Sequence, residues 1–276
     1  MIKTILFEHI PKTAGTTIHN ILESYYPAEK VISIDGIRLK ETHDKLNKLD
    51  ENDINELFVI KGHIILPYLE RIKNPFLFTF FREPVDRFIS QFYHIKNTKA
   101  NRFYEQVKDM DLDDYVDFSI ESYEDNIQTR FLSNTMHHRI SNTSNPPSLQ
   151  KDGGYIVKEA LKNIERFNYI FLTSLFDHAL IIMMHELKWK KLPLYTKANV
   201  KSKIRLEAEQ ITSKTIKKIE FSERFDIELY QRIKKRNEIL LDNYSYTKEL
   251  NSFRFKNRIY QKKQNFKSQI KRLISK

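Results

Sequence analysis

The chain has 276 residues, of which 40% are hydrophobic and 30% are charged, a composition typical of a soluble globular protein with a single core. It has no cysteine, which excludes disulfides, a zinc–thiolate site and a cysteine nucleophile. The formal net charge is +11, but nine of the 47 Lys and Arg residues and none of the acids lie in residues 253–276, and no recognition motif accompanies them, so we expect no specific nucleic-acid partner.

The hydropathy of the sequence also predicts where in the cell the protein is located. No run of 18 or more apolar residues occurs, and residue 2 already leads into a predicted strand. We therefore expect neither a signal peptide nor an N-terminal membrane anchor, and the simplest predicted location is the cytoplasm.

Short, continuous apolar runs alternate with segments of helical spacing along the chain. The runs predict buried strands at residues 5–10, 30–34, 57–61, 76–81 and 169–173. Helical spacing occurs at residues 18–25, 85–96, 112–120, 126–132, 157–167, 177–187, 212–221 and 225–241. Buried strands separated by helices favour an α/β fold of three layers, with a mainly parallel sheet flanked by helices.

The remaining segments are polar. Residues 36–53 show a weak helical period and predict a surface helix or connection, and residues 133–154 predict a long polar loop, either a functional lid or disordered. Without an internal repeat or a linker, we expect one domain over residues 1–250, followed by a basic amphipathic tail over residues 251–276.

The stretch TILFEHIPKTAGTTIHN at residues 4–20 predicts a strand, a tight loop and a helix. A helix that begins inside a Thr/Gly-rich loop presents unpaired backbone N–H groups and its positive dipole end to an anion. The loop residues are Lys12, Thr13, Ala14, Gly15, Thr16 and Thr17. Together they predict a cradle for a phosphate or sulfate ester, with an ordinary capped helix as the alternative. Because the lysine precedes the glycine, this is not the Walker pattern.

A second anion-binding feature is FREPVDRFISQFYH at residues 81–94. Arg82 follows a buried strand, at the edge where ligands bind in open parallel sheets. Ser90 lies about two turns into the next helix, so both side chains can reach one anion. The alternative for Arg82 is a structural ion pair with Glu83 or Asp86.

In combination, PKTAGTT and FREPVDRFISQFYH resemble the sulfotransferases that use 3′-phosphoadenosine 5′-phosphosulfate (PAPS), and in particular the carbohydrate sulfotransferases that modify heparan sulfate at 2-O and 6-O positions. The resemblance extends to DNIQTRFLS at residues 125–133 and covers roughly residues 3–245. It implies a P-loop-like fold and a reaction that releases 3′-phosphoadenosine 5′-phosphate (PAP). It also implies a carbohydrate acceptor and, with no export signal, a bacterial-type enzyme.

The resemblance assigns roles to the motif residues. The 5′-phosphosulfate loop corresponds to residues 12–17, although the family often has glycine or serine where this chain has Ala14. Arg82 and Ser90 correspond to the 3′-phosphate pair. Lys12 would bind the phosphosulfate and also neutralise charge that develops on the bridging oxygen.

A general base must deprotonate the acceptor hydroxyl, and a histidine suits this task. His63 ends a predicted strand, and the resembled 2-O-sulfotransferases have a Gly-His pair at a similar distance before the arginine motif. Those enzymes have a second histidine where this chain has Lys61. His9 is the rival candidate, which we expect to support the loop.

Other polar residues are assigned more broadly. His94 is expected to be structural or exposed, and His137 and His138 to lie in a solvated loop. Gln128 and Arg130 are expected either to contact the substrate or to support the donor site. Alternatively, the guanidinium of Arg130 forms an ion pair with a structural carboxylate. No cysteine and no His/carboxylate pair at ligand spacing lies near the motifs, so we expect no catalytic metal.

Two other functions remain open from the sequence. A nucleotide-dependent kinase would need a Mg²⁺-binding carboxylate beside the loop, and no convincing one follows a strand. A non-catalytic anion-binding protein would use the tail, whose apolar residues follow a helical stripe within a purely basic segment. Such a helix suits peripheral contact with anionic lipid at the inner face of a membrane, or an acidic partner.

Overall fold

The computed structural model describes residues 4–34, 36, 38–137, 139, 148–196, 211–244 and 246–274. Its centre is a five-stranded sheet in the order β2-β3-β1-β4-β5. The strands are β1 (Thr4–Glu8), β2 (Val31–Ile34), β3 (Val59–Gly62), β4 (Pro75–Phe81) and β5 (Tyr169–Leu172). Every neighbouring pair is parallel, which confirms the predicted parallel α/β sheet.

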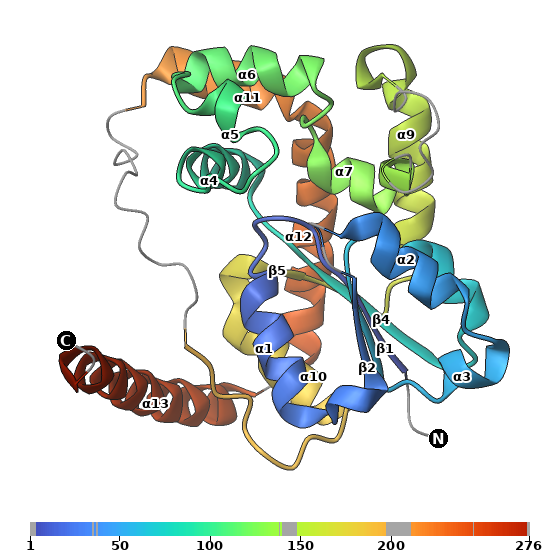
Figure 1. Ribbon diagram of the computed structural model, residues 1–276, viewed down its shortest axis with the longest axis vertical. Helices are drawn as coiled ribbons and strands as arrows, with labels where there is room; N and C mark the ends of the chain where they lie inside the picture. Colours follow the sequence, from blue (N-terminus) through green and yellow to red (C-terminus); the bar gives the residue numbers. More distant parts are fainter. Residues whose placement is uncertain are drawn as a thin grey trace.

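Helices cover both faces of the sheet, as Figure 1 shows. One face carries Phe7, Phe78 and Phe80, and it packs against α1 (Gly15–Tyr25), α10 (Phe176–Glu186) and the beginning of α13 (Thr247–Ile274). The other face carries Leu6 and Leu77. It packs against α2 (Leu39–Asn47), α3 (Glu51–Asn55), α7 (Ile127–Leu132), α9 (Leu149–Ile164) and α12 (Arg224–Asn243). Because side chains alternate across a strand, each strand contributes to both cores.

A third apolar cluster lies beyond the carboxyl ends of the strands (Figure 1). It is formed by α4 (Pro84–Lys96), α5 (Tyr104–Val107), α6 (Leu112–Glu121) and α11 (Ser213–Ser222). Short 3₁₀ turns occur at Ala28–Lys30, Leu66–Arg71, Thr135–His137 and Thr173–Leu175. The helices of the third cluster form a wall opposite the edge of the sheet at which the predicted motifs lie.

The prediction of a loop over residues 133–154 is wrong at its end, because α9 begins at Leu149. Its two glycines are therefore helical. A Cβ at Gly153 would lie 2.4 Å from the ring of Phe225, so the absent side chain lets α9 approach α12 closely. Packing by a residue distant in sequence thus outweighs the low helix propensity of glycine. Residues 138 and 140–147 of the predicted loop lie outside the described residues.

The C-terminal segment is one long helix, α13, which projects from the body in Figure 1. Its first turns bury Leu250 and Phe253 against the core cluster that contains α10. Further along, Phe255, Ile259, Phe266 and Ile270 are exposed. Among the described residues, no helix is long and apolar enough to cross a membrane.

Candidate active site

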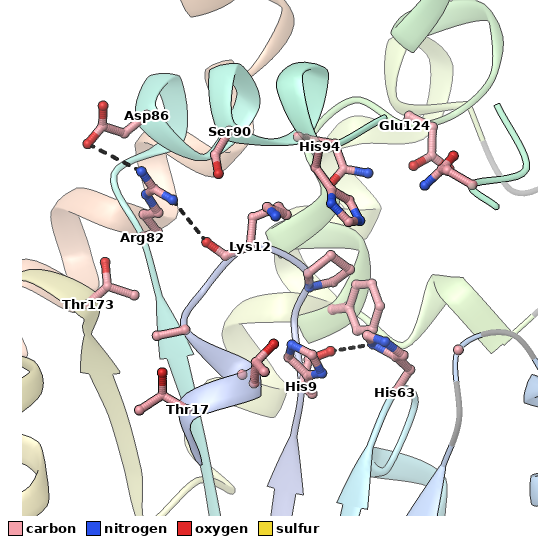
Figure 2. A pocket seen from close by; sticks show the side chains of 18 of the residues that line it. His9, Lys12, Thr17, His63, Arg82, Asp86, Ser90, His94, Glu124 and Thr173 are labelled. Atoms are coloured by element: carbon pink, nitrogen blue, oxygen red, sulfur yellow. Dashed lines mark hydrogen bonds and ion pairs between the residues drawn. The ribbon is translucent and has the colours of Figure 1, made fainter. Parts of the chain in front are cut away.

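The predicted motifs meet at the carboxyl edge of three adjacent strands, β3, β1 and β4. His63 follows β3, the loop that begins at His9 follows β1, and Arg82 follows β4. All three residues line one cavity of about 1000 Å³, and Figure 2 shows them around it. A parallel sheet brings these loops together because all its strands end at the same edge.

The backbone of the first loop forms an anion cradle. Lys12 and Ala14 have positive φ angles of 69° and 68°, whereas Thr13 between them does not. This alternation turns successive backbone N–H groups toward one concave side, the arrangement called a nest. Ala14 precedes α1 without a side-chain cap, so the first N–H groups of this helix are available to an anion.

The hydroxyl groups of the loop divide into two sets. Thr16 and Thr17 line the cavity. Thr13, which the sequence places in the cradle, is fully buried, and its hydroxyl donates to the carbonyl of Ile10 at 2.7 Å. Its side chain therefore stabilises the loop, and only its backbone can serve the cradle.

Two cations face the cradle. Burial lowers the pKa of Lys12 to about 8, and the charges of Arg82 and Arg87 lower it in the same direction. Arg82 donates to the carbonyl of Lys12 at 3.3 Å and lies 3.8 Å from the carboxylate of Asp86 (Figure 2). The ion pair that the sequence left open as an alternative therefore exists, but Arg82 also lines the cavity.

Ser90 and His94 extend from α4 into the same cavity. The helix begins well, because the carboxylate of Glu83 accepts from the N–H groups of Val85 and Asp86 and because Pro84 occupies its first position. Ser90 and Arg82 therefore line the same cavity, and their joint contact with one anion stays a prediction. Burial, followed by the charge of Lys12, lowers the pKa of His94 to about 4, so this side chain is neutral at pH 7.

Gln128 supports the backbone of Arg82 and is not among the residues that line the cavity. Its amide binds the backbone of Arg82 twice, accepting from N–H at 2.8 Å and donating to C=O at 3.0 Å. Asp226 on α12 accepts from the N–H groups of Gln128 and Thr129 and so caps α7. This chain of hydrogen bonds fixes the direction in which Arg82 leaves β4.

Arg130 is 1% exposed and pairs with Asp125 at 2.7 Å. This is the structural carboxylate that the sequence offered as an alternative. Direct substrate contact by Gln128 or Arg130 is not supported, because both side chains are buried and neither is among the residues that line the cavity. Their polar groups are already used to hold the third motif together.

His63 has a defined orientation. Its Nδ1 lies 2.6 Å from the carbonyl oxygen of His9, and since a carbonyl only accepts, Nδ1 carries the proton in the neutral ring. Nε2 is then the nitrogen with the lone pair. The backbone is held by His43, whose Nε2 lies 3.2 Å from the carbonyl oxygen of His63. This is the tautomer that a general base at Nε2 requires.

Several cavity residues were missed in the sequence. Thr173 and Ser174 follow β5, and Tyr230 lies on α12. The same argument that selected Arg82, a polar residue after a buried strand, also selects Thr173. On the far wall, Glu124 is 5% exposed and pairs with both Arg102 and Arg139; the sequence gives no signal for this cluster, because its members lie on separate segments.

Two further expectations concern histidines and metals. His138 and the side chain of His137 lie outside the described residues. Within the part of the chain that the structure describes, no group of three or more His, Cys, Asp and Glu residues is arranged to hold a metal ion.

Comparison with known proteins identifies the family of this chain. A model of the family described as "Sulfotransferase family" matches residues 3–238. The chain is also similar to the crystal structure of mouse sulfotransferase SULT7A1 complexed with PAP, with 12% sequence identity and a TM-score of 0.36 over 85% of this chain and 89% of that chain. No curated protein matches the chain.

The strained backbone at Ala14 predicts a stabilising substitution. A left-handed residue other than glycine costs about 1–2 kcal/mol, partly offset by the greater entropy of glycine in the unfolded chain. Ala14→Gly is therefore expected to raise the free energy of unfolding by roughly 0.5–1 kcal/mol, measured by denaturant unfolding. The control is Ala28→Gly, at an exposed site with no positive φ, which should lower it. A loss of stability in Ala14→Gly would contradict the nest.

Proposed function

The chain belongs to the sulfotransferase family, and we propose that it transfers the sulfuryl group of PAPS to a hydroxyl of a carbohydrate. PAPS is the sulfuryl donor of this family. The observation that carries the proposal is that the loop after β1, Arg82 with Ser90, and the oriented His63 line one cavity. The cradle at Lys12 and α1 suits the 5′-phosphosulfate, and Arg82 with Ser90 suits the 3′-phosphate.

In the proposed reaction the acceptor oxygen attacks sulfur while the bond from sulfur to the bridging phosphate oxygen breaks. The electron pair of that bond stays on the phosphate of PAP, and the acceptor proton passes to Nε2 of His63. Lys12 lies beside the cradle, where its charge stabilises the negative charge that grows on the leaving phosphate. Such preorganised electrostatic stabilisation is usually the largest contribution to catalysis.

The acceptor is proposed from the resemblance to carbohydrate sulfotransferases, and the character of the cavity supports it. Asn101, Arg102 and Glu124 on the wall opposite the cradle offer donors and acceptors to hydroxyl groups. Phe103 and Phe131 add apolar surface for the faces of a sugar ring. The cavity extends from the cradle to this wall, so one molecule of donor and one of acceptor can bind side by side.

We also propose that α13 binds the surface of an anionic membrane, at the inner face if the protein is cytoplasmic. Phe255, Ile259, Phe266 and Ile270 recur at spacings of four, seven and four residues, so they form one exposed stripe. Residues 253–276 hold nine Lys and Arg residues and no acid. An apolar stripe on the part of the helix that has basic and no acidic side chains matches a bilayer with acidic head groups.

The pKa of Lys12 predicts how donor affinity depends on pH. In the free protein this pKa is about 8, and a bound phosphate favours the charged ammonium and raises it. Above about pH 7, where the phosphates of PAP are fully ionised, the affinity for PAP should change little until the pH approaches 8 and then fall by up to about tenfold per pH unit, with proton uptake on binding at pH 8.

Calorimetric titrations with PAP in two buffers of different ionisation enthalpy measure both effects. Lys12→Arg keeps its charge throughout this range and should give an affinity that does not change between pH 7 and pH 9. The same decline in the variant and in the parent protein would show that Lys12 is not the titrating group.

Removal of the proposed base should affect turnover more than donor binding. His63→Ala is expected to lower kcat by roughly 10²–10⁴-fold and to leave the affinity for PAP within about threefold, since His63 does not lie at either proposed phosphate position. The assay uses radiolabelled PAPS and whichever saccharide of a glycan panel accepts the label. His185→Ala, outside the cavity, is the matched control. Unchanged kcat in His63→Ala would exclude His63 as the base.

The membrane proposal predicts sedimentation with lipid vesicles. The protein should sediment with vesicles that contain phosphatidylglycerol and less with purely zwitterionic ones, because both apolar burial and charge contribute. Replacing Phe255, Ile259, Phe266 and Ile270 by serine should abolish this, whereas Asn265→Ser with Gln269→Ser, also exposed on α13, should not. Equal sedimentation of both variants, or none of the parent protein, would refute membrane contact.

A further inference from the structure

A continuous chain of polar side chains runs from the protein surface to the active-site cavity beneath α1. Glu23, whose side chain is 56% exposed, lies 2.6 Å from the ammonium of Lys61. Lys61 Nζ lies 2.9 Å from Nδ1 of His19, and Nε2 of His19 lies 3.3 Å from Nδ1 of His9. His9 lines the cavity. The proposed mechanism has so far used none of these four side chains.

Lys61 sets the direction of the hydrogen bonds in this chain. Its side chain is fully buried, a costly position for an ammonium unless it is paired. An ammonium can only donate, so Lys61 donates one hydrogen to Glu23 and another to Nδ1 of His19. The carboxylate of Glu23 is thus the group that keeps a charged donor beneath α1.

The protonation pattern of the two histidines follows from that direction. Because His19 accepts at Nδ1, its own proton is on Nε2, from which it donates to Nδ1 of His9. His9 in turn carries its proton on Nε2. Both rings are neutral: burial, followed by nearby positive charge, lowers the pKa of His19 to about 3 and that of His9 well below its usual value.

The Nε2 edge of His9 lies against the beginning of α1. A Cβ built on Gly15 would lie 1.8 Å from Nε2 of His9, so glycine is required for the ring to occupy this place. The first N–H groups of α1 leave from the same point. The imidazole N–H is therefore positioned beside the backbone donors of the cradle.

His9 and His63 have opposite tautomers although their rings stack, with centroids 4.6 Å apart and planes inclined by 19°. His63 is protonated at Nδ1, because that nitrogen lies against a carbonyl oxygen. Its Nε2 accepts, whereas Nε2 of His9 donates. The hydrogen-bond network thus gives different protonation patterns to His9 and His63, the two histidines that the sequence offers as candidates for the general base.

We propose that His9 is a second catalytic residue, a neutral hydrogen-bond donor to the phosphosulfate, and that Lys61, His19 and Glu23 are positioning residues that fix its tautomer. This inference rests on the proposed sulfotransferase function. In the reaction, the N–H of His9 stabilises the oxygens that gain charge as the bond between sulfur and the bridging oxygen breaks, and it transfers no proton. A neutral imidazole suits this role because its donor does not depend on pH near neutrality.

The tautomers can be measured without any ligand. In protein with ¹⁵N-labelled histidine, ¹H–¹⁵N correlation spectra should show His9 protonated at Nε2 and His63 at Nδ1, with resonances assigned through His9→Gln and His63→Gln. Lys61→Met removes the donor to His19 and should change the ¹⁵N shifts of both His19 and His9. A proton on Nδ1 of His9 in the parent protein would overturn the inference, whether or not the protein transfers sulfate.

Kinetics test the catalytic role. His9→Leu removes the donor and should lower kcat about 10²-fold. The amide nitrogen of His9→Gln can replace Nε2, so the kcat of this variant should be at least about tenfold higher than that of His9→Leu. His9→Leu should also bind PAP more weakly than the parent protein and His9→Gln should restore part of that affinity, because the oxygen that gains charge stays on the 5′-phosphate of PAP. Lys61→Met should lower kcat by about tenfold without changing KM for PAPS.

Equal kcat in His9→Leu and His9→Gln, or a loss confined to KM, would overturn the role of His9. An error in the proposed sulfotransferase function would give a different result. The parent protein would then neither bind PAP nor turn over PAPS, while the tautomers of His9 and His63 could still be measured.

Discussion

The geometry of the site depends on one buried carboxylate, Glu8, at the end of β1. Its two oxygens accept from the N–H groups of Ile64, Ile65 and Leu66 at 2.6–3.0 Å. Its backbone oxygen accepts from the hydroxyl of Thr79 on β4 at 2.7 Å. Glu8 therefore links β3, β1 and β4, the strands followed by His63, by the loop with the nest and by Arg82. Burial raises the pKa of Glu8 to about 7, whereas the three N–H groups favour the carboxylate.

Around this junction several residues have strained backbone conformations or unfavourable positive charges, and a bound anion would stabilise them. Ala14 and Lys12 hold left-handed conformations, and Lys12 faces Arg82 with a lowered pKa. Lys61 is also buried, and it pairs with the carboxylate of Glu23. These features all increase the positive potential and the donor density at one edge of the sheet. The site is thus organised for negative charge before a ligand arrives.

Local sequence patterns predicted where the strands and most of the helices form. Apolar runs identified every strand among the described residues, and the shared edge of a parallel sheet then placed Lys12, His63 and Arg82 together. The direction of individual side chains was not predictable. The hydroxyl of Thr13 binds its own loop, Gln128 binds the backbone of Arg82, and α9 begins early because Gly153 packs on Phe225. Each of these outcomes depends on atoms that only the tertiary fold brings close.

The central claim is that the cavity binds a nucleotide with phosphates at both its 3′ and 5′ ends. Calorimetric titration with PAP, with adenosine 5′-phosphate and with ATP plus Mg²⁺ tests it most directly. The account predicts that PAP binds at least about tenfold more tightly than either other nucleotide, because only PAP fills the Arg82 and Ser90 position as well as the cradle, and a bidentate phosphate contact is worth about 1.5–3 kcal/mol. Tighter binding of ATP than of PAP would contradict it and favour a phosphotransferase.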